Sequence, residues 1–182
     1  MPTAGQGRAG GRIVNAPVTA ALEMKQVSKR YPGTLAVDRV DFEAKAGEVH
    51  ALMGENGAGK STLMKILAGS FSDYTGDILV RGTPVQLHSP RIAKAAGVEM
   101  IYQELSLAPA LSLAENILAG RLPVQAQLVL DRPAMMREAR ACLERVGLDC
   151  SPDTPVEALS LHEAQLVEIA KALGNGPCIL VM

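Results

Sequence analysis

The first half of the chain carries four short segments whose patterns predict antiparallel strands. Apolar and polar residues alternate loosely over residues 22–27 and strictly over residues 40–44, as expected for half-buried strands. Residues 76–80 and 85–87 predict a hairpin, because the four residues between them, Arg-Gly-Thr-Pro, form a turn sequence. The Tyr-Pro-Gly triplet at residues 31–33 predicts a turn between the first two segments.

Other segments are mostly apolar rather than alternating. Residues 49–53 and 178–182 predict strands buried on both faces, and residues 98–102 predict a further strand. Residues 62–68 predict a helix that Gly69 stops. The glycine-rich stretch before that helix is therefore expected to connect a strand to a helix.

Four sequence signals predict where other helices begin. A Ser-Pro pair at residues 89–90 predicts an N-cap with proline in the first helical position. Residues 112–115 and 160–163 both have the Ser-x-x-Glu pattern of a capping box. Residues 131–146 have apolar side chains at spacings that share one helical face.

One motif carries recognisable chemistry. Gly54, Gly59, Lys60 and Ser61 match the pattern G-x-x-x-x-G-K-[ST] without deviation. Glycines let successive N–H groups point inward around phosphate oxygens, and the following helix adds its positive N-terminal end. Lys60 is predicted to reach the β- and γ-phosphates, and the Ser61 hydroxyl to ligate Mg²⁺. The alternative is a glycine-rich turn that merely precedes a lysine.

Composition narrows the possible classes of protein. The chain has 182 residues, is 48% hydrophobic and 20% charged, and has a net charge of −1, values typical of a globular domain without a basic field for nucleic acid. No apolar run is long enough for a membrane helix, so membrane association is expected to come through a partner. Residues 1–20 lack the apolar core of a secretory signal and are expected to be a disordered extension. The spacing of the three cysteines favours reduced thiols over a disulfide or zinc site.

Four ordered motifs make the chain resemble the ATP-binding subunits of ABC transporters, specifically those of ribose- and galactose-type importers. Residues 56–63 resemble the family's P-loop and residues 101–104 its Q-loop. Residues 112–121 are similar to the stretch that follows the Q-loop, and residues 159–173 resemble the signature segment. The resemblance runs from about residue 22 to residue 182.

The resemblance implies the fold and the domain arrangement. We expect an α/β P-loop NTPase domain of ABC type over residues 21–182, with an antiparallel β subdomain and a helical insertion from about Ser106 to Leu173. The strand predicted at residues 178–182 is the one that leads, in the family, into the Walker B aspartate and the catalytic glutamate. Since neither acid is in the sequence, we expect an incomplete domain that binds ATP without appreciable turnover, and no catalytic residue is assigned.

The resemblance also assigns site residues. The predicted ATP-binding positions are Tyr31, Gly54, Glu55, Asn56, Gly57, Ala58, Gly59, Lys60, Ser61, Thr62 and Ser160. The predicted Mg²⁺ ligands are Ser61 and Gln103, and Gln103 is also expected to position water and sense the transmembrane partner.

Three of these positions have roles that only the family suggests. Tyr31 would stack on adenine, the alternative being a tyrosine that packs on a hairpin turn. Gln103 is otherwise an ordinary polar residue after a strand. Ser160 would contact the γ-phosphate of ATP held by an opposite ATPase domain. His162 and Glu163 depart from the small residue and the glutamine usual in the signature, so they crowd the approach to phosphate and add negative charge.

The function implied is ATP-driven carbohydrate import at the cytoplasmic face of the cell membrane. The implied partners are a second ATP-binding domain, transmembrane permease subunits and, indirectly, a sugar-binding protein. Two alternatives stay open. The first is a nucleotide-binding module that does not hydrolyse ATP, which a comparison of ATP turnover with ATP binding would distinguish. The second is an ABC ATPase for drug export or DNA repair. The sugar-type segments around Gln103 and residues 167–171 argue against the second.

Overall fold

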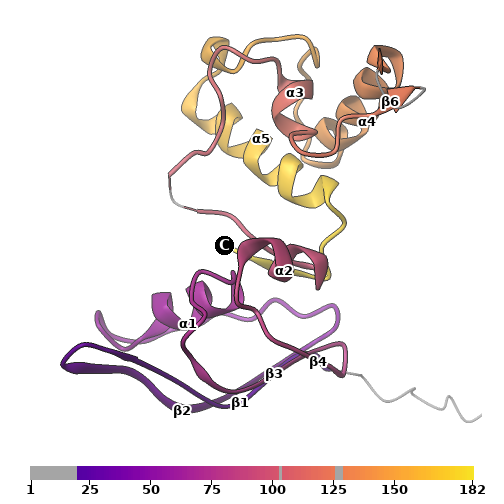
Figure 1. Cartoon of the computed structure of the whole chain (residues 1–182). Helices are drawn as coiled ribbons and strands as arrows, with labels where there is room; N and C mark the ends of the chain where they lie inside the picture. Colours follow the sequence, from indigo (N-terminus) through magenta and orange to yellow (C-terminus); the bar gives the residue numbers. More distant parts are fainter. Residues whose placement is uncertain (1–19, 103, 126–128) are drawn as a thin grey trace, which may run out of the picture.

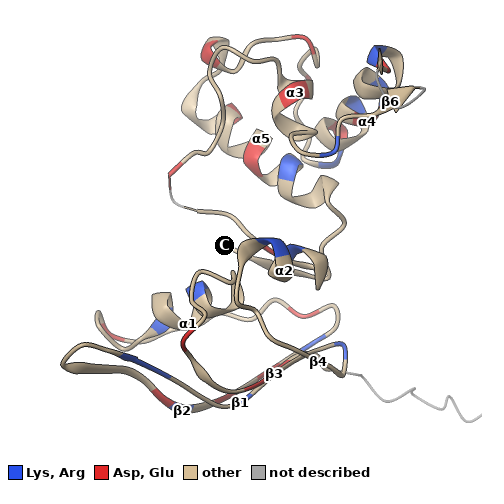
Figure 2. Cartoon of the chain, in the orientation of Figure 1, with Lys and Arg blue, Asp and Glu red and all other residues tan. Residues whose placement is uncertain are grey.

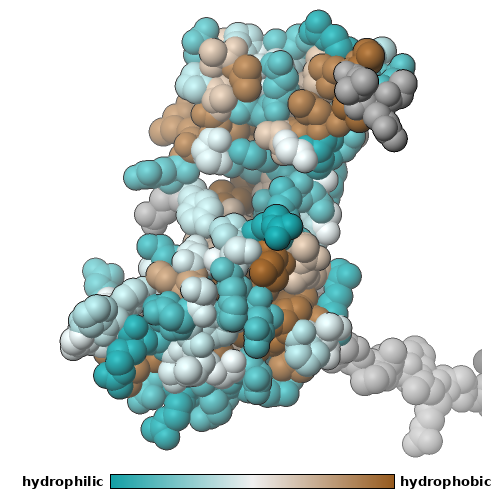
Figure 3. Space-filling view, viewed as in Figure 1, coloured by the Kyte–Doolittle hydropathy of each residue, from teal (hydrophilic) through white to brown (hydrophobic). Residues whose placement is uncertain are grey.

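The computed structural model describes residues 20–102, 104–125 and 129–182, which form two lobes. The antiparallel sheet and helices α1 and α2 make up one lobe, and helices α3, α4 and α5 make up the other (Figure 1). A narrow waist joins the lobes in the space-filling view (Figure 3). The predicted extension at residues 1–20 falls almost wholly outside the described residues.

A four-stranded antiparallel sheet forms the base of the first lobe. It consists of β1 (Ala20–Tyr31), β2 (Thr34–Lys45), β3 (Thr75–Val80) and β4 (Thr83–Val85), in the order β2-β1-β3-β4. The first three predicted strands and the turn after Tyr31 are confirmed, although β1 and β2 are longer than their alternating patterns. The strands are longer because the backbone hydrogen bonds between β1 and β2 continue up to the turn that joins them, beyond the residues that alternate. The last strand of the predicted hairpin lies at residues 83–85 rather than 85–87, because the turn takes only residues 81–82.

A separate parallel pair lies between the sheet and the helical lobe. β5 (Val98–Met100) pairs with β8 (Ile179–Val181), residue for residue. This confirms a strand at each position, shorter by two residues than predicted in each case. The two strands lie far apart in sequence, and the whole helical lobe is inserted between them.

The prediction of a buried strand at residues 49–53 is wrong. Those residues have no regular secondary structure, Val49 is fully exposed, and Met53 is 87% exposed. A strand buried on both faces lies inside a sheet and is covered by other elements on each side, whereas no described strand pairs with residues 49–53. An apolar run alone therefore did not determine the local structure.

The helices begin where the sequence signals placed them, except that α1 begins two residues before the predicted stretch 62–68. They are α1 (Lys60–Leu67), α2 (Pro90–Ala95), α3 (Leu113–Ile117), α4 (Arg132–Arg145) and α5 (Leu161–Gly174), with a 3₁₀ turn at Val156–Ala158. Both capping boxes form, and a short hairpin of β6 (Val124–Gln125) and β7 (Val129–Leu130) precedes α4. None of these described helices is both long and apolar enough to cross a membrane.

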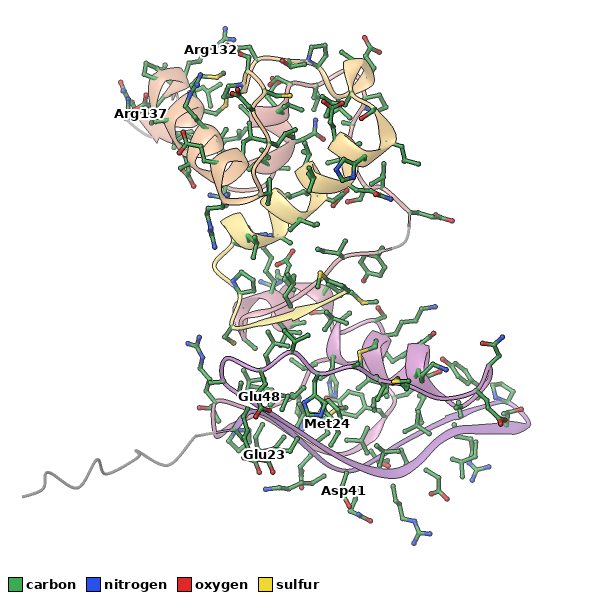
Figure 4. The ribbon with its side chains drawn as sticks, turned by 180° about the vertical axis from the view of Figure 1, so that it is seen from behind. Glu23, Met24, Asp41, Glu48, Arg132 and Arg137 are labelled. Carbon is green, nitrogen blue, oxygen red and sulfur yellow. The ribbon has the colours of Figure 1, made fainter. Side chains whose placement is uncertain are left out.

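Each lobe has its own hydrophobic core. In the first lobe the sheet packs against α1 through buried side chains that include Met24, Val37, Leu63 and Ile66. Figure 4 shows Met24 on the side of the sheet that faces α1, whereas Glu23 and Asp41 lie on the outer side. In the second lobe α3, α4 and α5 enclose a core of their own. Full burial of one such side chain contributes about 1.5–3 kcal/mol, so the sheet holds α1 firmly.

The end of α1 is fixed by a close approach to α2. Gly69 follows α1 with φ +72°, and a Cβ added there would lie 2.3 Å from the carbonyl oxygen of Ser89, the N-cap of α2. Gly147, after α4, has nearly the same φ of +70° but open space around it. A side chain at Gly147 would therefore meet only backbone strain, whereas a side chain at Gly69 would meet both strain and a steric clash.

We expect Gly69→Ala to destabilise the chain more than Gly147→Ala does. A left-handed φ costs about 1–2 kcal/mol for alanine at either position, and only Gly69→Ala adds a clash with backbone. Urea unfolding followed by circular dichroism measures both free energies of unfolding. Equal losses in the two variants would contradict the close packing of α1 on α2.

Candidate functional site

The predicted P-loop is an open loop on the first lobe that leads directly into α1. Lys60 is the first residue of α1, Gly59 is its N-cap, and residues 56–57 form a turn. Most of the loop is exposed, whereas Gly59, Lys60 and Thr62 are half-buried. The predicted helix after the loop is confirmed, while the segment before the loop has no regular secondary structure.

Gly59 fixes the loop against β2. It has φ +83°, and a Cβ added there would lie 2.3 Å from the carbonyl oxygen of Ala36 and 3.3 Å from the Val37 side chain. A residue with a side chain would push the loop off the strand. The second glycine of the motif is thus required by packing as well as by conformation.

Lys60 closes the loop on itself. Its ammonium donates hydrogen bonds to the carbonyl oxygens of Gly54 and Glu55, at Nζ–O distances of 2.6 and 2.7 Å. The amide of Ala58 donates to the Glu55 oxygen as well, at 3.2 Å. The Lys60 side chain therefore lies over the loop, the same loop whose N–H groups are expected to point toward a phosphate.

The N-terminal end of α1 is a suitable anion site. Its N-cap has no side chain, and its first turn, Lys60-Ser61-Thr62, contains no acid. The N–H groups of a first helical turn lack acceptors within the helix, and the helix dipole gives that end partial positive charge. Lys60, the first residue of α1, adds to this charge, whereas the other lysine of the helix, Lys65, lies in its last turn (Figure 2). The residues present thus fit a polyphosphate, and Ser61 is exposed beside it.

Tyr31 lies at the end of β1 and is held by its neighbours. Its ring meets Phe71 edge-on at a centroid distance of 5.7 Å, and the ammonium of Lys29 lies over the ring at 5.0 Å. Lys29 is buried and is paired with Asp73, whose pKa its hydrogen bond holds below the ordinary value. The Tyr31 side chain remains half-buried.

Lys29 and Phe71 were not predicted from the sequence. The pattern contained one signal, because residues two apart on a strand share a face and Lys29 therefore lies beside Tyr31. Phe71 comes from the loop after α1, and no local pattern indicates that contact.

Ser160 belongs to the other lobe. It is the N-cap of α5: its hydroxyl lies 2.7 Å from the Glu163 carboxylate, to which its backbone N–H also donates. Figure 1 shows α5 and α1 in different lobes, so this chain does not bring Ser160 to its own P-loop. Ser160, Leu161 and His162 are all exposed. Gln103, the other predicted residue outside the P-loop, lies outside the described residues.

A hollow of about 330 Å³ lies elsewhere in the first lobe, next to β3 and β4. Tyr74, Asp77 and His88 are among its lining residues. It contains no glycine-rich loop and no lysine or arginine, so it lacks what a polyphosphate requires. The candidate site is therefore the open P-loop and not this hollow.

The chain matches the family model described as "ABC transporter" over residues 37–182. It is 51% identical over 160 residues to the ribose import ATP-binding protein RbsA of Rhodopirellula baltica, which covers 88% of this chain and 31% of that protein. It is 48% identical over 163 residues to the xylose import ATP-binding protein XylG of Moorella thermoacetica, covering 88% and 32%. The chain thus spans about a third of the length of these relatives.

The fold is also similar to solved structures. One is a nucleotide-free ATP-binding cassette from an ABC transporter, with a TM-score of 0.75 and 25% identity over 90% of this chain and 68% of that one. The expected ABC-type α/β fold is confirmed by this similarity.

The capping box at Ser160 makes the stability of α5 depend on pH. Hydrogen bonds from the Ser160 hydroxyl and N–H lower the pKa of Glu163 from its ordinary value of 4.5. A carboxyl whose pKa is lower in the folded state stabilises the fold above about pH 4.5, and this contribution is lost as pH falls through the folded value. We expect Glu163→Gln to flatten the decline in stability at acid pH.

Urea unfolding at several values between about pH 7 and pH 3 measures this dependence. Glu144→Gln on the exposed surface of α4 is the matched control and should leave the decline unchanged. A parallel decline in wild type and Glu163→Gln would show that the capping box does not hold the carboxylate in the folded state.

Proposed function

Since this chain belongs to the ABC transporter family, we propose that it is an ATP-binding part of a carbohydrate importer. The observation that carries the proposal is the P-loop: Gly59 packed flat on β2, with Lys60 over the loop and the uncapped end of α1 beside it. The names of the ribose and xylose import relatives support carbohydrate as the cargo. The ABC ATPases of drug export or DNA repair remain the alternative class.

Lys60 is the first residue of the proposed binding step. Its ammonium exchanges two carbonyl acceptors, those of Gly54 and Glu55, for the β- and γ-phosphate oxygens. Charged acceptors form stronger hydrogen bonds than neutral carbonyls, which favours the exchange. The N–H groups of residues 54–62 complete the cradle around the phosphates.

Ser61 is the proposed Mg²⁺ ligand among the described residues, and the resemblance adds Gln103. Serine at the start of the P-loop helix presents a hydroxyl oxygen, the kind of ligand that this cation prefers. Mg²⁺, when bound, neutralises part of the phosphate charge. Tyr31 is proposed to offer the ring face away from Lys29 to adenine.

Ser160 supports a partnership with a second ATP-binding domain. It lies at an exposed helix end, next to Leu161, which is 68% exposed, and away from the P-loop of its own chain. We propose that it serves the nucleotide of an opposite domain. The proposed assembly also includes permease subunits, with the ATP-binding part at the cytoplasmic face of the membrane, and a sugar-binding protein outside it.

We expect Lys60→Ala to lower the affinity for ATP at least about tenfold, which is about 1.4 kcal/mol. The variant removes the cation that faces the β- and γ-phosphates. Titration with a fluorescent ATP analogue measures the affinity, and Lys65→Ala is the matched control, since Lys65 is exposed on the same helix. Equal affinities for wild type and Lys60→Ala would remove the P-loop from the proposal.

We expect Tyr31→Ala to lower ATP affinity at least about fivefold, because stacking of a base on an aromatic ring is lost. Tyr31→Phe keeps the ring and should bind nearly as wild type. Tripolyphosphate, which has no base, should compete equally well in all three proteins. A loss shared by Tyr31→Phe, or by tripolyphosphate, would contradict a stacking role.

A further inference from the structure

Lys29 occupies a position on β1 where the pattern favours an apolar residue. Leu22, Met24 and Val27 of the same strand belong to the hydrophobic core of the first lobe. Lys29, two residues after Val27, is also buried and only 3% exposed. A buried ammonium costs free energy unless other groups compensate for the lost water, so Lys29 requires specific partners.

Three side chains lie around the Lys29 ammonium. The Asp73 carboxylate accepts its hydrogen bond and forms an ion pair with it. The ring centroids of Tyr31 and Phe71 lie 5.0 and 4.8 Å from the nitrogen, and the two rings meet edge-on. A cation within about 6 Å of a ring centroid is attracted to the face of the ring. One ammonium therefore holds both rings and is itself held by one carboxylate.

This cluster, which consists of Lys29, Tyr31, Phe71 and Asp73, joins two segments that are distant in sequence. Lys29 and Tyr31 are on β1, whereas Phe71 and Asp73 lie in the loop between α1 and β3. That loop follows the P-loop helix, and Gly69 within it packs closely on the N-cap of α2. The Tyr31 ring is therefore tied to the chain that follows α1 and is not held by β1 alone.

The Lys29 cluster also lies next to the loop that is proposed to bind phosphate. Lys29 pairs with Val37 in the antiparallel ladder of β1 and β2. A Cβ added at Gly59 would lie 3.3 Å from the Val37 side chain, so the P-loop rests on the cross-strand neighbour of Lys29. Residues opposite each other in such a ladder have Cβ atoms about 4.5–5.5 Å apart. The Lys29 cluster and the P-loop are thus attached to the same part of the sheet.

We propose that Lys29, held by Asp73, is a positioning residue that fixes the Tyr31 ring for the base of the nucleotide while the P-loop holds the phosphates. The inference rests on the proposed function, because it needs a nucleotide that spans Tyr31 and the P-loop. The ammonium covers one face of the ring, which leaves the opposite face for the base. A ring that is fixed before binding loses less conformational entropy when the base stacks on it. Lys29 therefore strengthens recognition of the base and leaves phosphate binding unchanged.

The first arm of the test compares ATP with tripolyphosphate, which has phosphates and no base. Lys29→Met keeps an unbranched side chain and leaves behind only Asp73, whose side chain is 72% exposed, so no buried charge loses its partner. This variant should bind ATP at least about threefold more weakly and tripolyphosphate as tightly as wild type does. Lys25→Met is the matched control and should bind both ligands as wild type does. Lys25 lies on the same strand and also pairs with an acid, Glu23, but its side chain is 55% exposed.

A double-mutant cycle then asks whether Lys29 acts through Tyr31. Once Tyr31→Ala has removed the ring, adding Lys29→Met should weaken ATP binding no further. Losses that multiply in the double variant would mean that Lys29 contributes by another route, and they would overturn the positioning role.

The second arm needs no nucleotide. The sequence has no tryptophan, so Tyr31→Trp places a single reporter in the Lys29 cluster. Adding Lys29→Met should increase acrylamide quenching of that tryptophan about twofold or more, because the ring loses the cation that holds it. Asp73→Asn, which removes only the charge of the partner, should give a smaller increase and carries the test if Lys29→Met does not fold.

The two arms separate the possible failures. Unchanged quenching in Lys29→Met, or equal losses of affinity for ATP and for tripolyphosphate, overturns the positioning role while the proposed function stands. A wild-type chain that binds neither ligand overturns the proposed function, and the quenching arm then still decides whether Lys29 holds the ring. Increased quenching together with a loss of affinity confined to ATP supports both.

Discussion

The candidate site depends on the contact between Gly59 and the backbone of β2. No side chain fits between the loop and the Ala36 carbonyl oxygen, so the loop lies flat on the strand and α1 begins at a fixed place. The next residue of β2, Val37, shares a hydrophobic core with Leu63 of α1, which holds the helix at the same place. The sheet therefore determines where the N–H groups and Lys60 are presented.

The second lobe has a hydrophobic core separate from that of the first. Its core is formed by α3, α4 and α5, and the chain passes between the lobes twice, after β5 and before β8. Ser160 and the hydrogen-bonded pair Glu168 and Ser106 belong to this lobe.

Local structure was predicted well from the sequence, and contacts between residues distant in sequence were not. The capping boxes at Ser112 and Ser160 and the start of α2 depend on neighbouring residues, and all are confirmed. Residues 49–53 were predicted wrongly because burial of a strand depends on which strands pair with it. The Phe71 contact with Tyr31 and the Glu168 contact with Ser106 each depend on the tertiary fold. The ligand roles of Gln103 and Ser160 remain predictions from resemblance.

The central claim is that this P-loop recognises the polyphosphate of a nucleotide. Isothermal titration of the wild-type chain with ATP, ADP, AMP and adenosine in Mg²⁺ tests it most directly. Affinity should fall with each phosphate removed, and AMP should bind at least about a hundredfold more weakly than ATP, a difference of about 2.7 kcal/mol. AMP or adenosine binding as tightly as ATP would contradict the account.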